Sequence, residues 1–587
     1  MTGRPAAGLP LKAHGAIGDG RGTAALVAAD ASIDWFCPAR FDAPASLFRL
    51  VDSRGEHVRL GPRRPGAAGE QSYDAGGAAI LTTTLTDREA LLEVTDHMDG
   101  GRIVRVLTAL RGTTDVVLDV ETGDRFGVAR KVERWSDGIA FGALLIRGLT
   151  AGEPIRLEAG DRRVVTIVRR DEDRVTRSGP EREALTVDGA FREHDGIRRR
   201  WRSEAGEVDF DGLHRPAVLA SVRALRMLTD SSTGALVRAL TTSLPARLDN
   251  ERNLDERYCW LRDNAAAVRL WERIGRRDWA DASRAWLAER GGDELPFAPV
   301  YRVDGDGLPS EEELSLPGWR GSGPVRVGNR ASAALDLGAI AELSLVLDAD
   351  RSWRDLERIA DWLSTNGMRA DHGRWDSRSR PVRNVESAVA VRAALAAIVR
   401  TATKRNPLDL ALIEWRTAVR SLDTWLGAEG LFGIGPASGW RRCGADDADD
   451  SSDASMLRWL ADVAPSLPGD DELEALDRSA MSIDQSVAQL TEWPFLHRHL
   501  PHVDDGFPPG QGTDLWASFT MVSALCTVER WEEAHRRMET LLGFLGPTAI
   551  GATHADPMTG DLRGNLLAAP MHLALIDAAI ALSQGPR

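Results

Sequence analysis

The hydrophobic pattern of this 587-residue chain changes near His214, and that change constrains the fold more than any other feature. Up to that point, short runs rich in Val, Ile, Leu and Thr alternate with turn residues, a pattern typical of a β-sandwich. These runs lie at residues 22–28, 32–37, 78–86, 102–110, 114–120, 139–146 and 163–168. Beyond it, apolar residues recur at helical spacing, as in Val218, Val222 and Leu225. We therefore expect a β domain followed by an all-α domain.

The second part has room for roughly a dozen helices of ordinary length. No sequence repeat of fixed period is visible, which disfavours a solenoid and favours a ring of helices with functional loops at one end. A charged stretch at residues 188–212 separates the two parts and contains the basic run 198–202. Such a run could bind anions, but a solvated linker or helix face is the more common explanation.

Composition limits the compartment and the partners. The net charge is −15 and there is no basic stripe, so nucleic acid is not an expected partner. The first 18 residues lack the apolar core of a signal peptide, and no apolar run approaches the ~18 residues of a membrane span. The cysteines are scattered without a CxxC pair, which disfavours a disulfide framework or a zinc site. We expect a soluble, cytoplasmic protein without metal or cofactor, for which a homo-oligomer is possible.

Several features leave alternatives open. The chain has 18 Trp against 3 Tyr, and an indole can fill a core or stack on a sugar. The acidic run 446–450 could bind calcium, but its spacing matches no EF-hand, so a hydrated loop is favoured. Motifs for nucleotide binding, zinc proteases and serine hydrolases are absent from the sequence.

Two short stretches could carry chemistry. Arg262 and Asp263 end the run 257–263 and could form a helix cap with a salt bridge, or could bind sugar hydroxyls through a guanidinium and a carboxylate. Asp376 follows Trp375, and a carboxyl beside an indole can stay protonated near neutral pH and act as a general acid. A Trp-Asp pair alone is weak evidence for catalysis.

Four motifs, in order along the chain, resemble those of glycoside hydrolase family 15, which includes glucoamylases, glucodextranases and bacterial trehalases. They are residues 18–27 with 32–37 and 40–44, residues 241–245 with 257–263, residues 318–329, and residues 556–560 with Gly564, Asn565 and His572. The resemblance implies a multidomain β + all-α protein with an N-terminal β-supersandwich and a C-terminal (α/α)6 barrel. The expected boundaries are 1–197 for the β domain, 198–230 for a linker with helical segments, and 231–587 for the barrel.

The resemblance also implies inverting hydrolysis of an α-glucosidic bond, in which one carboxylic acid protonates the leaving oxygen and a carboxylate activates water on the opposite face. Arg262 and Asp263 would hold the sugar at the reacting subsite. The other expected substrate-binding residues are Trp260, Trp319, Arg320, Trp375, Glu386 and Gln511.

The sequence departs from the family at both catalytic positions. Where the family has a glutamic acid as general acid, this chain has Asp376, which is one methylene shorter, and a displacement of roughly 1 Å can cost about a hundredfold in rate. Where the family has a glutamate as general base, this chain has Thr553, whose hydroxyl cannot accept a proton at neutral pH. The adjacent His554 could accept one, because imidazole titrates near neutrality.

Three functions fit these observations. We favour an enzyme with altered chemistry, in which Asp376 is the acid and the substrate is an α-glycoside or a related acetal or enol ether. The second is an ordinary inverting α-glucosidase, trehalase or glucoamylase whose base is His554, Glu386 or an aspartate of the run 446–450. The third is a non-catalytic carbohydrate-binding relative. In each case the expected partner is a small carbohydrate or a glycosylated metabolite.

Overall fold

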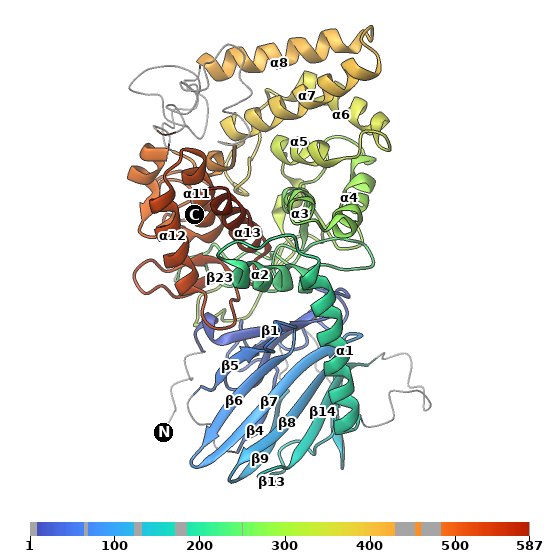
Figure 1. Cartoon of the computed structure of the whole chain (residues 1–587), viewed down its shortest axis with the longest axis vertical. Helices are drawn as coiled ribbons and strands as arrows, with labels where there is room; N and C mark the ends of the chain where they lie inside the picture. The colour runs from blue at the N-terminus through green and yellow to red at the C-terminus, as the bar shows by residue number, and fades with distance from the viewer. Residues whose placement is uncertain are drawn as a thin grey trace.

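The computed structural model describes residues 9–63, 68–122, 132–170, 185–248, 250–428, 452–459, 480 and 483–585. A sheet-rich N-terminal part and a helical C-terminal part lie end to end along the long axis of the molecule (Figure 1). The expected order, β followed by α, is confirmed. Within the described ranges, no helix is both long and apolar enough to cross a membrane. The cytoplasmic location and the oligomeric state stay predictions.

The N-terminal part consists of two antiparallel sheets that share one apolar core. One sheet has the order β1-β2-β3-β4-β9-β13 and the other the order β10-β11-β12-β14-β8-β7-β6-β5. The strands are β1 (His14–Gly18), β2 (Ala24–Ala28), β3 (Ser32–Phe36), β4 (His57–Pro62), β5 (Glu70–Tyr73), β6 (Leu81–Asp87), β7 (Ala90–Asp99), β8 (Arg102–Arg111), β9 (Thr113–Glu121), β10 (Val132–Trp135), β11 (Gly138–Phe141), β12 (Leu144–Arg147), β13 (Ile155–Glu158) and β14 (Arg162–Arg169). The single strand expected at 139–146 is therefore wrong, because a turn at Gly142, with φ 49°, divides it into β11 and β12.

Two helices connect the parts: α1 (Val187–Gly206) and α2 (Arg215–Met227). The α1 helix begins at Thr186, whose side chain accepts a hydrogen bond from the Gly189 amide, a normal N-cap. It carries the basic run, of which Trp201 is buried and donates to the Gly76 carbonyl at 2.9 Å. The run is thus part of a helix packed beside the sandwich, with Trp201 turned inward and Arg199, Arg200 and Arg202 exposed. The predicted boundary at residue 197 falls inside α1, and the boundaries themselves stay predictions.

The helical part surrounds the pocket described below. Its helices are α3 (Leu261–Arg273), α4 (Arg277–Gly291), α5 (Leu337–Val346), α6 (Trp353–Asn366), α7 (Val385–Arg405), α8 (Ala411–Ala428), α11 (Leu515–Thr527), α12 (Trp531–Phe544) and α13 (Ala569–Ser583), with short 3-10 turns η1 (Leu11–Ala13), η3 (Arg330–Ala333) and η5 (Ala454–Trp459). The helices α5, α11 and α13 are apolar on nearly all sides and form the centre of the core, as expected for helices that neighbours cover all round.

Short strands lie among these helices. They are β15 (Cys259–Trp260) with β16 (Val300–Tyr301), β17 (Glu312–Leu314) with β18 (Val325–Val327), and a five-stranded sheet of β19 (Thr491–Glu492), β20 (Phe495–Leu496), β21 (Thr513–Asp514), β22 (Ala552–Ala555) and β23 (Leu562–Leu566). The helical periodicity did not predict them. Residues of β21, β22 and β23 position several side chains of the pocket and its surroundings.

Arg257 fixes the N-terminal part to the segment that precedes α3. It is 1% exposed and binds the Asp255 carboxylate with two nitrogens, at 2.9 and 2.7 Å. A third nitrogen donates to the Ala43 carbonyl, in one of the N-terminal motifs, at 2.7 Å. The ion pair therefore holds the backbone on both sides of residue 256 against the β domain.

We expect Arg257→Met to lower the free energy of unfolding by about 3–5 kcal/mol, because it leaves the buried Asp255 carboxylate without its ion partner. Thermal and urea unfolding of the purified variant measures this. Exposed Arg273→Met, which removes a surface pair with Asp577 at 2.5 Å, is the control and should change stability by about 1 kcal/mol or less. Equal, small effects of the two substitutions would contradict the assignment.

Candidate functional site

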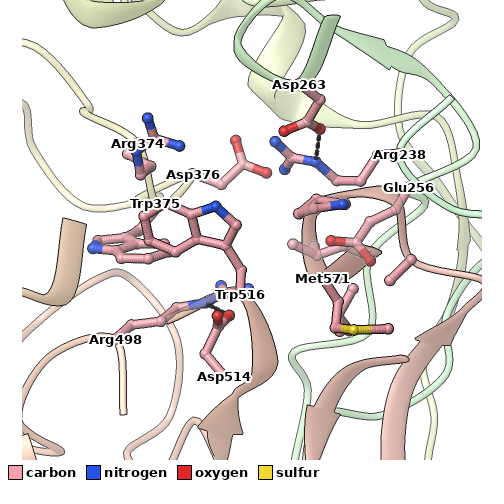
Figure 2. A pocket seen from close by; sticks show the side chains of 14 residues that line it. Arg238, Glu256, Asp263, Arg374, Trp375, Asp376, Arg498, Asp514, Trp516 and Met571 are labelled. Carbon is pink, nitrogen blue, oxygen red and sulfur yellow. Dashed lines mark hydrogen bonds and ion pairs between the residues drawn. The ribbon is translucent and has the colours of Figure 1, made fainter. Parts of the chain in front are cut away.

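A pocket lies where the N-terminal ends of α3, α11 and α13 converge (Figure 2). It is lined by Arg238, Leu254, Glu256, Asp263, Arg374, Trp375, Asp376, Arg498, Asp514, Trp516, Thr553, Ala568, Pro570 and Met571. Three of the residues predicted from sequence to touch substrate or react, namely Asp263, Trp375 and Asp376, lie here together with Thr553.

Asp376 projects into this pocket from the loop that precedes α7 (Figure 2). Its backbone has φ 61°, a left-handed conformation that few residues other than glycine adopt. Burial of the carboxyl raises its pKa to about 7, against the opposing effect of Arg238, Arg378 and Arg498. Among the described residues the carboxyl has no hydrogen-bond or ion-pair partner, so a bound ligand could take its proton.

Asp263 stands in the first turn of α3 and faces the pocket with Arg238. The Arg238 Nε donates to the Asp263 carboxylate at 2.7 Å, and the guanidinium lies over the Trp260 ring, 3.7 Å from its centre. Trp260 therefore supports Arg238 from behind and does not line the pocket. The polar pair expected at the sugar is Arg238 with Asp263.

Two indoles form the apolar wall of the pocket. Trp375 and Trp516 meet edge to face with ring centres 5.4 Å apart. The Trp375 nitrogen donates to Asp453, the residue before η5, at 2.7 Å, which fixes the ring position. An aromatic wall of this kind suits the apolar face of a sugar ring.

The two residues expected at the position of the base are placed differently. Thr553 lines the pocket, whereas His554 lines an adjoining cavity with Arg252, Phe507 and Asn565. The His554 Nδ1 lies 2.8 Å from the Thr553 hydroxyl. Burial, with nearby arginines, lowers the pKa of His554 well below its usual value, so its imidazole is neutral and a weak proton acceptor. This environment disfavours His554 as the base.

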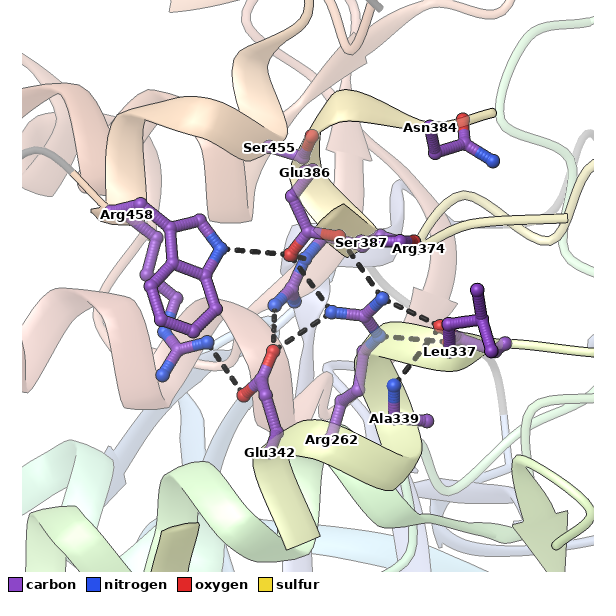
Figure 3. A network of polar contacts seen from close by, with 12 residues as sticks. Arg262, Leu337, Ala339, Glu342, Arg374, Asn384, Glu386, Ser387, Ser455 and Arg458 are labelled. Atoms are coloured by element: carbon purple, nitrogen blue, oxygen red, sulfur yellow. Dashed lines mark hydrogen bonds and ion pairs between the residues drawn. The ribbon is translucent and has the colours of Figure 1, made fainter. Parts of the chain in front are cut away.

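The prediction that Arg262 binds the sugar is wrong. Arg262 is 3% exposed and lies in a network of carboxylates behind the pocket (Figure 3). It donates to both oxygens of Asp336 at 2.8 and 2.6 Å, to both oxygens of Glu386 at 2.8 and 3.0 Å, and to Glu342 at 2.8 Å. Each nitrogen of its guanidinium is engaged, so none is left for substrate.

Glu386 belongs to the same network. It lies in the first turn of α7, accepts from Arg262 and from the Trp459 nitrogen at 2.9 Å, and lines a small cavity on the far side of Trp375. A carboxylate held by an arginine and an indole is a poor general base. Its expected role as substrate ligand or base is therefore not supported by its contacts.

The remaining predicted residues lie outside the pocket lining. Trp319 is buried between the guanidinium groups of Arg320 and Arg563, at 4.3 and 5.4 Å from its ring centre. Gln511 is buried and donates to the His499 carbonyl at 2.6 Å. The acidic run 446–450 lies outside the described residues. In the described part of the chain, no group of three or more His, Cys, Asp or Glu is placed to hold a metal ion.

Residues that the sequence reasoning missed complete the site: Arg238, Glu256, Arg374, Arg498, Asp514 and Trp516. Glu256 was within reach of prediction, since it directly precedes the motif 257–263. Asp514 is the N-cap of α11 and accepts from the Ala517 amide at 2.8 Å and from Arg498 at 2.7 Å. Arg498 and Trp516 carry no local signal of their own, and only the fold brings them to the pocket.

Comparison with known proteins finds glycoside hydrolases among the similar sequences and structures. The sequence pattern described as "Glycosyl hydrolases family 15" matches residues 212–426. The chain is similar to a trehalase of Mycolicibacterium smegmatis, with 28% identity over 97% of this chain and 91% of that protein. It is also similar to a trehalase of Thermoplasma acidophilum, with 24% identity over 95% of this chain and 98% of that protein.

The structure agrees in fold with a bacterial glucoamylase complexed with acarbose, with a TM-score of 0.65 over 97% of this chain and 93% of that one, at 10% identity. The chain is thus similar to glycosyl hydrolases of family 15 over residues 212–426 and to trehalases over nearly its whole length. The resemblance read from the four motifs is thereby confirmed. The substitutions at the family's catalytic positions stay predictions, and so do the individual roles of the site residues.

We expect Arg262 to contribute to the stability of the fold. Arg262→Met should lower the free energy of unfolding by about 3–5 kcal/mol, because three buried carboxylates lose their common cation. Arg269→Met is the matched control, since Arg269 is partly exposed and, within the described ranges, pairs with a single carboxylate, that of Glu342 at 3.1 Å. Thermal unfolding measures both. A variant of Arg262 with unchanged stability and an increased KM for sugar would show that the guanidinium binds substrate after all.

Proposed function

We propose that this chain hydrolyses a small α-linked glucoside, or a closely related acetal, in the pocket of Figure 2, with Asp376 as the proton donor. The observation that carries the proposal is the Asp376 carboxyl, which faces the pocket with its pKa raised to about 7. An acid with such a pKa is partly protonated at neutral pH and can give its proton to a leaving oxygen. The relatives named trehalase support this reaction class.

The other pocket residues fit a sugar. The Arg238–Asp263 pair offers charged donors and acceptors for hydroxyl groups, and Trp375 with Trp516 offers a surface for the ring. The finer architecture, a β-supersandwich followed by an (α/α)6 barrel, is part of this proposal and is supported by the likeness to the glucoamylase fold.

The experiment is hydrolysis of trehalose, maltose and maltotriose by the purified protein, followed by proton NMR, which identifies the anomer released. We expect Asp376→Asn to lower kcat by about 10²- to 10⁴-fold, because the leaving oxygen loses its proton donor. The control is Asp281→Asn, an exposed aspartate of α4 that pairs with Arg284 on the surface. Sugar binding by calorimetry without any turnover would instead favour the non-catalytic relative.

The pH profile follows from the state of Asp376. Its reactive form is the protonated one, so kcat/KM should fall as pH rises through about 7, roughly tenfold per unit well above that value. Asp376→Asn should remove this descending limb from the residual activity. An unchanged limb in the variant would assign the titration to another group.

A further inference from the structure

Four carboxylates line the pocket, and their partners divide them into two classes. Asp263 is paired with Arg238 and Asp514 with Arg498, each at 2.7 Å. Asp376 and Glu256 have no ion-pair partner within 4 Å among the described residues. The two that are free of a direct counter-ion are the ones suited to moving protons, because an ion pair holds a carboxylate in its charged form.

Glu256 and Asp376 lie on opposite sides of the pocket (Figure 2). Asp376 projects from the side formed by Arg374 and Trp375, and Glu256 from the side of Arg238 and Met571. Glycosidases that invert configuration need such an arrangement, with a donor at the leaving group and an acceptor across the ring.

Glu256 is held in a defined position. Its carboxylate accepts from the Asn565 amide at 2.8 Å, and Asn565 is itself fixed by the Thr241 hydroxyl at 3.0 Å and the Leu244 amide at 3.2 Å. The buried Asp255–Arg257 pair anchors the backbone on either side. Residues of two motifs, 241–245 and Gly564-Asn565, thus orient the carboxylate of Glu256, which belongs to neither motif.

Glu256 is also a neighbour of the position where the family has its base. Glu256 and Thr553 both line the pocket, and both line the adjoining cavity. Residue 553 has no carboxylate, but Glu256 supplies one to the same pocket from a different segment of the chain.

We infer that Glu256 is the general base of this chain and takes the proton from the attacking water. The inference rests on the proposed function and names the partner that Asp376 lacks. The water oxygen bonds to the anomeric carbon while one of its protons moves to the Glu256 carboxylate. The glycosidic C–O bond breaks, and its oxygen receives the Asp376 proton. One proton then returns from Glu256 to Asp376 through solvent, which completes the cycle.

The surroundings of Glu256 agree with this role. Burial raises the pKa of Glu256, which makes the carboxylate a stronger proton acceptor, while nearby Arg238 and Arg498 favour its ionised form. Asp263 and Asp514 in the pocket and Glu386 beside it are all held by arginines. They would accept a proton less readily.

The test compares Glu256→Gln with Asp376→Asn on trehalose, maltose and α-glucosyl fluoride. Fluoride departs without a proton donor, so its hydrolysis requires the base alone. We expect Glu256→Gln to lower kcat on all cleaved substrates by about 10²- to 10⁴-fold, and Asp376→Asn to spare the fluoride relative to the disaccharides. Glu251→Gln is the matched control, an exposed glutamate of the same loop outside the pocket lining.

A second variant separates catalysis from folding. Glu256→Ala leaves space beside the substrate, and sodium azide should restore turnover with formation of a glucosyl azide of inverted configuration. A purely structural glutamate gives no such product. Fluoride hydrolysis by Glu256→Gln at the rate of the unmodified protein, or a loss of activity that azide does not restore, overturns the inference alone. Absence of turnover by the unmodified protein on all three probes overturns the proposed function and the inference with it.

Discussion

The buried cluster around Arg262 is the interaction on which the site depends. Arg262 enters at the start of α3 and binds Asp336 at the N-cap of α5 and Glu386 in the first turn of α7. Three helix N-termini are thereby held together by one cation and its carboxylates. Asp336 and Glu386 also lie at the positive ends of their helices, where negative charge is favoured. Removing such a cation is costly, because the acids it satisfies cannot reach water.

The same cluster positions Asp376, the proposed proton donor. Arg374 donates to Glu342 at 2.6 Å, while its guanidinium lies over the Trp516 ring, 4.8 Å from the centre. Arg374 is two residues before Asp376, so the loop bearing the acid is tied to the core on one side and to the aromatic wall on the other. The left-handed backbone at Asp376 is stable only because this anchoring is strong, and strain of this kind is typical of functional positions.

Much of the architecture was readable from the sequence, and the failures have identifiable physical causes. The runs that became β2, β3, β8, β9 and β14 are dense in branched apolar residues, which the pattern detects. The ten-residue β7 was missed because Glu93, Thr95 and Asp96 alternate with its apolar residues and dilute the signal. The two-residue strands near the pocket have no periodicity to detect, since their pairing is set by the fold.

Part of the site was also predictable, where its residues lie next to motifs that can be recognised in the sequence. Asp263, Trp375, Asp376 and Thr553 are adjacent to recognisable motifs and lie in the pocket. Local sequence does not distinguish Arg262 from an arginine that binds sugar, but consecutive residues of a helix point about 100° apart. Asp263 therefore faces the pocket while Arg262 faces the core. Adjacency in the sequence cannot distinguish these two orientations. The structure does, because Arg262 binds the buried Asp336 and Glu386 at the starts of α5 and α7.

Thr553 and Glu256 line the same pocket, and this neighbourhood is the basis for proposing that the base has changed its place in the chain. A general base must reach one water molecule on one face of a sugar, and the chemistry does not specify which segment supplies the carboxylate. Residues 254–256 and β22 approach that region from two directions, and Asn565 on β23 bonds to both the Leu254 carbonyl and the Glu256 carboxylate. If Glu256 is the base, as we propose, a threonine at 553 is compatible with hydrolysis, because the acceptor is then supplied from another segment of the pocket wall and is oriented by Asn565.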